Sequence, residues 1–169
     1  KTVIYANGAE VPAVEIEPDG LQEVHESVAP PTSTDKGEIL KAIRESGIVG
    51  LGGAGFPTSV KLNVPEGRKL EILIVNGAEC EPYITSDYRE MIENPEGIVE
   101  GTKRLMEITG VGEAIIAIED NKPEGIKKLS ETAREYKGIR VQPLRTRYPQ
   151  GGEKQLIYAV TGRKVPAGK

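Results

Sequence analysis

The residues from Gly47 to Lys61, which read GIVGLGGAGFPTSVK, combine unusual backbone freedom with one cation. Five of the nine residues from Gly47 to Gly55 are glycine, which is typical of tight turns or of a backbone that a ligand approaches closely. Such a loop can present consecutive N–H groups to an anion or lie flat against an aromatic ring. Pro57 and Thr58 favour the start of a short helix, so Lys61, one turn later, is placed to reach a phosphate.

The same segment formally matches the pattern G-x-G-x-x-G at Gly50, Gly52 and Gly55. In a dinucleotide-binding Rossmann turn this pattern follows a strand, whereas here a predicted helix precedes it, so we reject that interpretation. The chain holds no G-x-x-x-x-G-K-S/T motif, which excludes a nucleotide-binding kinase or GTPase of the P-loop type. The structural alternative is a turn with a packed Phe56, and composition favours the functional loop over it.

A second candidate segment is the acidic loop NGAECEPYITSD at residues 76–87. Glu79, Glu81 and Asp87 crowd this loop together with Asn76. Their oxygens can accept hydrogen bonds from sugar hydroxyls or ring N–H groups. A solvated acidic loop is the alternative, and for this segment taken alone it is the more frequent case.

A third candidate segment is TRYPQGGEKQ at residues 146–155. Tyr148 can stack on a ring or donate a hydrogen bond. Gly152 and Glu153 begin a predicted helix whose N-terminus would point into the same crevice. The alternative is a glycine-containing loop with a capping glutamate. Taken together, the three loops predict a concave site for a phosphorylated, ring-bearing ligand.

Strands and helices alternate after residue 68, and this order explains how the loops can meet. We predict strands at 69–76, 113–120 and 139–144 and helices at 94–110, 122–138 and 152–162, with an earlier helix from Asp35 to Gly47. This alternation is typical of an α/β fold, a parallel sheet with crossover helices. Ligands of such sheets bind beyond the carboxyl ends of the strands, which singles out the loops 76–87, 119–121 and 145–152.

The first 34 residues differ from the rest of the chain. Residues 1–17 alternate between apolar and polar types around Asn7-Gly8, which predicts a β-hairpin. Residues 18–34 are polar and contain proline, so we expect a linker. The sequence does not begin with methionine, and we therefore expect a piece of a longer protein.

Composition excludes several classes of function. A net charge of −4 and a pI of about 5.3 argue against a nucleic-acid partner. With Cys80 as the single cysteine, the chain can form no internal disulfide and no iron–sulfur or cysteine-rich zinc site of its own. His25 is the single histidine, which nearly excludes Ser-His and His-metal constellations. No run of eighteen apolar residues occurs, so no transmembrane helix is predicted.

The motifs GLGGAGFPTSVKL, NGAECEPYITSD and YPQGGEKQLI resemble those of the C subunit of the Rnf electron-transport complex. More distantly they resemble the flavin-bearing subunit of respiratory complex I and related hydrogenase and formate dehydrogenase subunits. The resemblance covers about residues 36–169, with three motifs in the same order. The Rnf form fits better where the two differ: Leu51 replaces an arginine, residues 80–83 replace E-x-E-P-G, and residues 151–154 replace C-G-E-E.

The resemblance implies a site for flavin mononucleotide (FMN) and NADH. In this family the glycine loop faces the flavin and the nicotinamide, the phenylalanine flanks the adenine, and the other two loops close the pocket. By motif position, the implied cofactor-binding residues are Gly50, Gly52, Gly53, Ala54, Gly55, Phe56, Lys61, Asn76, Glu79, Glu81, Tyr148, Gly152 and Glu153. No catalytic acid or base and no metal ligand is implied, because the flavin itself takes the hydride from NADH. Lys154 stands where complex I has an acidic residue, so flavin binding is better supported than the NADH geometry.

The resemblance also implies a domain division and a place in the cell. Residues 1–34 would be the hairpin and linker remnant of a barrel-sandwich domain, and residues 35–169 an FMN- and NADH-binding domain truncated at its C-terminus. The downstream Asn-Val-x-Thr segment and the cysteine motifs for 4Fe-4S clusters of the parent protein are missing, so this fragment alone is expected to be inactive. The parent would be a peripheral subunit on the cytoplasmic face of the membrane.

The implied function is electron transfer between NAD(H) and the iron–sulfur clusters of an ion-translocating NAD:ferredoxin oxidoreductase. Its partners would be the other subunits of the Rnf-type complex, with NADH and ferredoxin as redox partners. Two alternatives stay open: a paralogous subunit that feeds a soluble reductase of the proline-reductase type, and a nonredox assembly module that has lost its flavin. The second alternative predicts gaps in the motif residues, and this chain has none.

Overall fold

The computed structural model describes residues 1–4, 7–21, 23–26, 28–51, 55–65 and 67–168. The chain divides into two compact units, Lys1–Ser33 and Thr34–Lys169. In the first unit, β1 (Thr2–Ile4) and β2 (Glu10–Pro12) pair antiparallel, which confirms the predicted hairpin. The described residues of this unit after β2 form no helix or strand, as their composition predicts.

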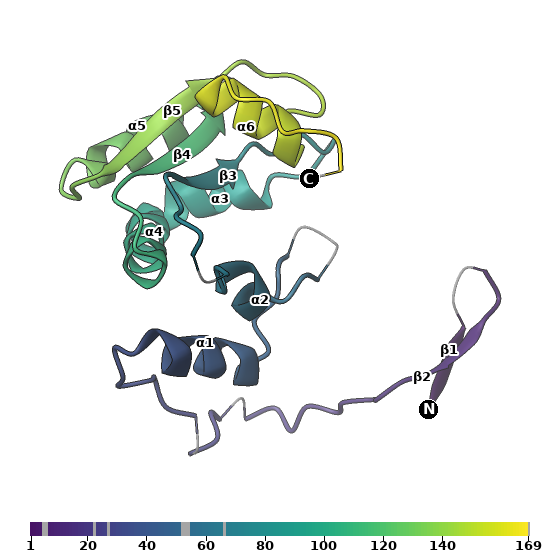
Figure 1. Ribbon diagram of the computed structural model, residues 1–169. Helices are drawn as coiled ribbons and strands as arrows, with labels where there is room; N and C mark the ends of the chain where they lie inside the picture. Colours follow the sequence, from purple (N-terminus) through teal and green to yellow (C-terminus); the bar gives the residue numbers. More distant parts are fainter. Residues whose placement is uncertain (5–6, 22, 27, 52–54, 66, 169) are drawn as a thin grey trace. The chain divides into compact units, whose positions relative to one another are not determined.

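A three-stranded parallel sheet forms the centre of the second unit. Its strands are β3 (Leu73–Gly77), β4 (Ala114–Glu119) and β5 (Ile139–Leu144), in the spatial order β3-β4-β5 (Figure 1). The strands start level with one another, because Leu73 pairs with Ala114 and Ala114 with Ile139. The predicted α/β fold with a parallel sheet is therefore confirmed.

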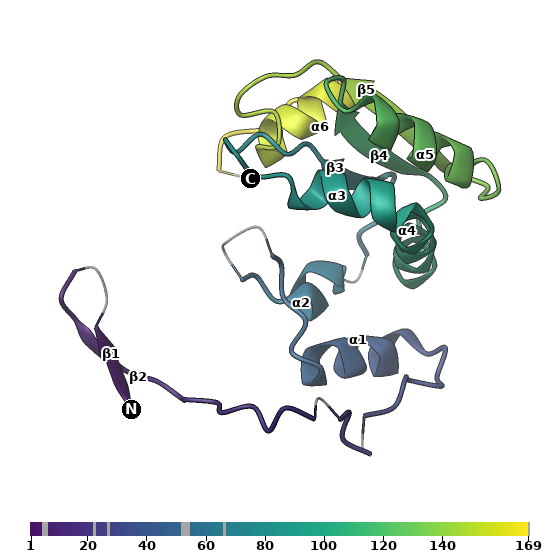
Figure 2. The ribbon, with the colours of Figure 1, turned by 180° about the vertical axis from the view of Figure 1, so that it is seen from behind.

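Helices cover both faces of this sheet. The crossover from β3 to β4 contains α3 (Ser86–Glu93) and α4 (Pro95–Thr109), and the crossover from β4 to β5 contains α5 (Pro123–Ala133). All three helices lie on one face of the sheet, as Figure 2 shows. The reason is that both crossovers lead to the next strand in the same direction across the sheet, and crossovers between parallel strands are right-handed. On the other face lies α6 (Glu153–Thr161). Among the described residues, none of the helices has the length and apolar character needed to cross a bilayer.

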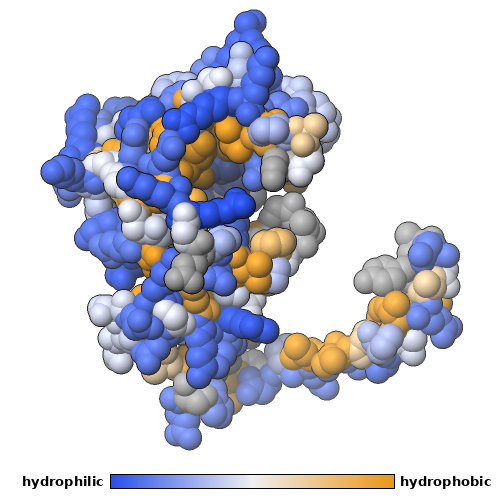
Figure 3. Space-filling model, in the orientation of Figure 1, coloured by the Kyte–Doolittle hydropathy of each residue, from blue (hydrophilic) through white to orange (hydrophobic). Residues whose placement is uncertain are grey.

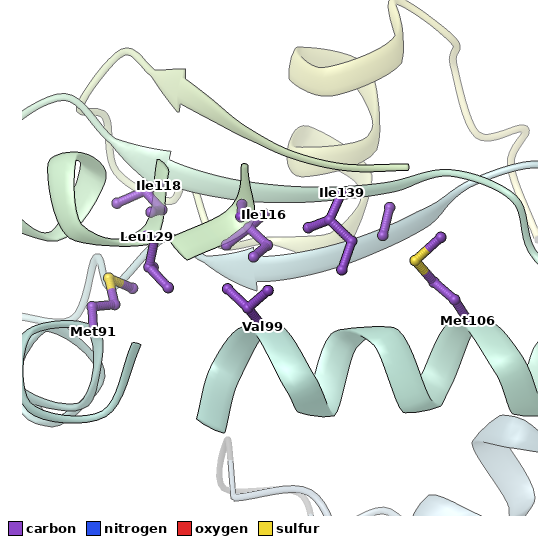
Figure 4. Packing of buried hydrophobic residues seen from close by; sticks show 9 residues of the cluster. Met91, Val99, Met106, Ile116, Ile118, Leu129 and Ile139 are labelled. Carbon is purple, nitrogen blue, oxygen red and sulfur yellow. The ribbon is translucent and has the colours of Figure 1, made fainter. Parts of the chain in front are cut away.

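Side chains of the central strand β4 supply both cores. Ile116 and Ile118 point toward the crossover helices and pack with Val99 of α4 and Leu129 of α5 (Figure 4). On the opposite face, Ala117 packs with side chains of β5 and α6. All six residues of β4 are buried, which is the expected pattern for a parallel strand covered on both faces.

Local capping signals placed several helices correctly. The Asn94 side chain accepts a hydrogen bond from the Gly97 amide at 3.1 Å, and Gly110 closes α4 in the left-handed conformation, as predicted. The earlier helix α1 (Lys36–Glu45) begins after Asp35, whose side chain accepts from the Glu38 amide at 3.0 Å.

Two predicted boundaries were wrong, and one helix was not predicted. The strand expected at 69–76 begins only at Leu73, where its first partner on β4 is available. The helix expected at 122–138 ends at Ala133, because the next three amides bond to carbonyls three residues back and tighten the chain into turns. Helix α3 was not predicted, and the reason is a capping partner that lies far from it in sequence.

Candidate functional site

Side-chain hydrogen bonds join the loops that follow the three strands. The Asn76 side-chain amide, at the end of β3, donates to the Gly151 carbonyl oxygen at 3.0 Å. The Asp120 carboxylate, just after β4, accepts from the Thr146 amide at 3.0 Å and from its hydroxyl at 2.6 Å. The predicted meeting of the loops at the carboxyl edge of the sheet is therefore confirmed.

Gly151 allows two of these loops to touch. A Cβ at this position would lie 2.7 Å from the Ala78 carbonyl oxygen and 3.5 Å from the Cys80 sulfur. The first distance is shorter than any relaxed contact, so a larger residue would push the loops apart. The third loop is thus built around a close backbone approach to the acidic loop.

Glu79 is buried, with 7% of its surface exposed, and its carboxylate binds the start of α3. One oxygen accepts from the Asp87 amide at 2.8 Å, and the other accepts from the Tyr88 amide at 3.3 Å. These two amides belong to the first turn of α3, where N–H groups lack helical partners and a negative charge is favourable. The carboxylate therefore serves as the cap of α3 from outside the helix.

Two carboxyl groups of the loops have shifted pKa values. Partial burial raises the pKa of Asp87, and the nearby charges of Glu79 and Glu81 raise it further. The hydrogen bonds from the Thr146 hydroxyl and amide lower the pKa of Asp120. The carboxylates of the acidic loop therefore repel one another, whereas the contact with Thr146 favours the ionised form of Asp120.

A groove of about 690 Å³ runs along β3 beside α6 and contains three of the predicted site residues: Lys61, Asn76 and Glu153. Ile74 and Leu156 contribute apolar lining. Figure 3 shows apolar side chains gathered in a hollow on this side, with hydrophilic side chains around it. The groove thus combines an apolar wall with a cation, an amide and a carboxylate.

A second hollow, of about 590 Å³, lies between α5 and the junction of α3 with α4. None of the predicted site residues lines it, and its polar lining includes Glu93, Glu96, Glu131 and Glu135. It lies on the face of the sheet opposite α6, so we take the groove beside α6 as the candidate site.

The described ends of the glycine-rich segment bond to each other ahead of the short helix α2 (Thr58–Leu62), which was predicted. The Gly50 amide donates a hydrogen bond to the Phe56 carbonyl oxygen at 2.8 Å, and the Thr58 amide donates one to the Ile48 carbonyl oxygen at 3.1 Å. Gly55 has a φ of +59°, which suits glycine. Phe56 is 53% exposed and is not packed in the core, which disfavours the purely structural alternative.

Several predicted residues lie outside the groove. Gly52, Gly53 and Ala54 fall outside the described residues, and the groove lining does not include Gly50, Gly55 or Phe56. Tyr148 is 78% exposed and lines a separate hollow of about 270 Å³, Glu81 is exposed, and Gly152 is the N-cap residue of α6. The structure thus brings three of the predicted side chains into one groove, and the contribution of the others to binding stays a prediction.

Sequence analysis missed a buried ion pair beneath the acidic loop. Glu119 is 1% exposed and Lys122 is 7% exposed, and the lysine ammonium lies 3.2 Å from the glutamate carboxylate. One signal was available, because Glu119 continues the alternation of Ile115 and Ala117 along a strand predicted to be buried. The partner at Lys122 had no comparable signal.

The chain is similar to several known proteins. The model of the family "Nuo51 FMN-binding domain" matches residues 43–169. The C subunit of the proton-translocating ferredoxin:NAD(+) oxidoreductase complex of Clostridium ljungdahlii is 48% identical over 163 residues, a match that covers 92% of this chain and 35% of that protein. The C subunit of the Na(+)-translocating ferredoxin:NAD(+) oxidoreductase complex of Acetobacterium woodii is 44% identical over 167 residues, with 97% and 38% covered.

Similarity extends to a solved structure. A crystal structure of an NAD+-reducing NiFe-hydrogenase in the air-oxidized state matches with a TM-score of 0.64 and 28% identity, covering 79% of this chain and 25% of that one. The chain spans little more than a third of the length of the two curated relatives. Because the family model covers most of the sequence and the fold agrees with that of the hydrogenase chain, the chain belongs to the family of the Nuo51 FMN-binding domain.

Proposed function

We propose that this chain is the FMN- and NADH-binding part of the C subunit of an Rnf-type, ion-translocating ferredoxin:NAD oxidoreductase. The names of the two relatives and the family model support this function. In the parent protein, electrons would pass between NAD(H) and 4Fe-4S clusters. The present sequence has one cysteine, Cys80, so the ligands of those clusters would lie elsewhere in the parent.

The observation that carries the proposal is the groove in which Lys61, Asn76 and Glu153 meet. Its volume of about 690 Å³ falls within the range of small-molecule and cofactor sites, roughly 300–1,000 Å³. FMN needs an apolar surface for its ring, polar partners for its ribityl chain and a positive environment for its phosphate. Ile74 and Leu156 supply the apolar surface, and Lys61, Asn76 and Glu153 supply the positive charge and the polar partners. The residues present therefore fit the cofactor.

Each residue has a distinct role in this proposal. Lys61 would neutralise the phosphate, while Asn76 and Glu153 would hydrogen-bond the ribityl hydroxyls. The glycine loop would lie flat against the ring, and Phe56, Glu81 and Tyr148 would contact the nicotinamide nucleotide. Bound flavin supplies hydride acceptance and one-electron donation, and the protein supplies orientation and electrostatics.

The wider setting is part of the same proposal. Residues 1–34 would belong to a preceding barrel-sandwich domain and residues 35–169 to the cofactor domain. The parent would associate peripherally with a membrane complex on its cytoplasmic face, docked to the other subunits and exchanging electrons with NADH and ferredoxin. The relatives, which are themselves named as subunits of ion-translocating complexes, support membrane-complex association in general terms.

Titration of the full-length protein with FMN, followed by quenching of flavin fluorescence, tests the proposal. We expect saturable quenching with one FMN per protein molecule, weakened by Lys61→Ala and by Gly53→Val. Lys41→Ala, an exposed lysine of α1, is the matched control and should bind like the parent. Absence of saturable binding by the full-length protein would contradict the proposed function and favour a nonredox module.

A further inference from the structure

Lys122 is a buried cation directly beneath the acidic loop. It occupies the N-cap position of α5, and only 7% of its surface is exposed. Its ammonium lies 3.2 Å from a Glu119 carboxylate oxygen, 3.4 Å from the Glu79 carbonyl oxygen and 3.4 Å from the Asn121 side-chain oxygen. Lysine is almost never this buried unless it is paired, because a buried ammonium without partners is very costly. The three acceptors therefore fix the position of the ammonium.

Glu119 depends on the same contact. It is 1% exposed, and its second carboxylate oxygen, Oε1, has no hydrogen-bond partner among the described residues. The charge of this carboxylate is thus compensated chiefly by Lys122. Since a buried carboxylate without a partner is strongly unfavourable, the pair is held as a unit.

The pair connects β4 to the acidic loop. Lys122 binds the main chain of Glu79, while the Glu79 side chain caps α3 through the amides of Asp87 and Tyr88. A single residue of the loop is therefore held at its carbonyl by the ion pair and at its carboxylate by a helix. Movement of Lys122 would release the first of these two anchors.

Electrostatics adds a second effect. Glu79, Glu81 and Asp87 place three carboxylates in the loop, and Lys122 is the cation that counteracts the rise in the pKa of Asp87. A phosphate monoester carries a charge of about −1.5 to −2 at pH 7. Removing the lysine charge would leave the loop more negative and less favourable for a phosphorylated ligand.

We propose that Lys122 is a positioning residue for the cofactor site: with Glu119 it holds residues 79–87, the loop that follows Asn76 and carries Glu81, in the conformation that the site requires. This inference rests on the proposed function, which places FMN beside Asn76, just before the loop, and the nicotinamide nucleotide beside Glu81. The lysine need not touch the cofactor. It acts through the main chain of Glu79 and through the charge balance of the loop.

The test uses the full-length protein and three variants. Lys122→Met removes the cation, and the double variant Glu119→Gln with Lys122→Met removes it without leaving a buried unpaired carboxylate, which protects the test against misfolding. Lys128→Met is the matched control, because Lys128 is also on α5, is partly buried and donates to a main-chain carbonyl, that of Ile92, at 2.8 Å.

The first measurement is hydrogen–deuterium exchange of the FMN-free protein. We expect the amides of Asp87 and Tyr88 to exchange at least tenfold faster in the double variant, with β4 unchanged and no change in Lys128→Met. The second measurement is FMN titration. We expect the Kd to rise at least tenfold in the double variant, about 1.4 kcal/mol, and less than twofold in the control.

The outcomes separate this inference from the proposed function. Unchanged exchange in residues 79–88, or faster exchange spread evenly over β4 and α4, would overturn the positioning role. Faster loop exchange with an unchanged Kd would overturn its importance for the cofactor. If the unmodified full-length protein binds no FMN, the proposed function fails, and the exchange measurement still decides whether Lys122 positions the loop.

Discussion

Replacement of Glu79 tests the unusual cap of α3. The carboxylate accepts two backbone hydrogen bonds, at 2.8 and 3.3 Å, in a residue that is 7% exposed. Hydrogen bonds to a charged group contribute about 1.5–3 kcal/mol each, and the longer one belongs at the low end. The interaction with the helix dipole adds about 0.3–1 kcal/mol. Relief of repulsion with Asp87 and access of water to the freed amides offset part of this sum.

We therefore expect Glu79→Ala to lower the free energy of unfolding by about 2–3 kcal/mol, and Glu79→Gln, which keeps one neutral acceptor, by about 1–2 kcal/mol. Equilibrium urea unfolding followed by far-UV circular dichroism measures both. Glu81→Ala is the matched control, because Glu81 is an exposed glutamate two residues away, and it should change the value by less than about 0.5 kcal/mol. A Glu79→Ala protein as stable as the control would refute the capping role.

Three further predictions follow from the loop contacts. Gly151→Ala should destabilise the protein by about 1–3 kcal/mol, measured by urea unfolding, because its Cβ would lie 2.7 Å from the Ala78 carbonyl oxygen; an unchanged midpoint would contradict the close approach. The raised folded-state pKa of Asp87 means that stability falls as pH rises above the ordinary value of 3.8. Asp87→Asn should therefore stabilise at pH 7 by about 0.5 kcal/mol or less, after allowance for screening, and the gain should vanish below pH 3.8; a gain that persists at low pH would contradict this. The pKa of Asp120 is lowered, because the Thr146 hydroxyl and amide donate hydrogen bonds to its carboxylate. Thr146→Val should therefore move the pKa of Asp120 back toward 3.8, as measured by NMR titration. An unshifted pKa of Asp120 would show that the hydroxyl contributes nothing.

Sequence reasoning succeeded where structure depends on neighbouring residues. The helix α4 has an N-cap at Asn94, Pro95 in its first turn and Gly110 after its end, and all three act within a few residues of the helix ends. The strand β5 was predicted with its observed bounds, because Ile139 and Val141 alternate with Arg140 and Gln142 as a strand requires. These signals also placed the loops at one edge of the sheet.

Features that depend on distant partners were not predictable in the same way. Helix α3 has one buried residue, Met91, and its cap comes from Glu79, seven residues before the helix begins. The spacing of Tyr88, Met91 and Ile92 was an available helix signal, but it covers little more than one turn, and no side chain next to the helix caps it. The ion pair of Glu119 and Lys122 matters because Lys122 reaches the main chain of Glu79 across 43 residues of sequence, a contact that exists only in the folded sheet.

The most direct test of the central claim is an experimental structure of the full-length protein with FMN bound. The account predicts flavin density in the groove beside α6, with the phosphate near Lys61 and the ribityl chain within hydrogen-bond distance of Asn76 or Glu153. Density for FMN at any other position, with these three side chains facing solvent, would contradict the assignment of this groove as the cofactor site.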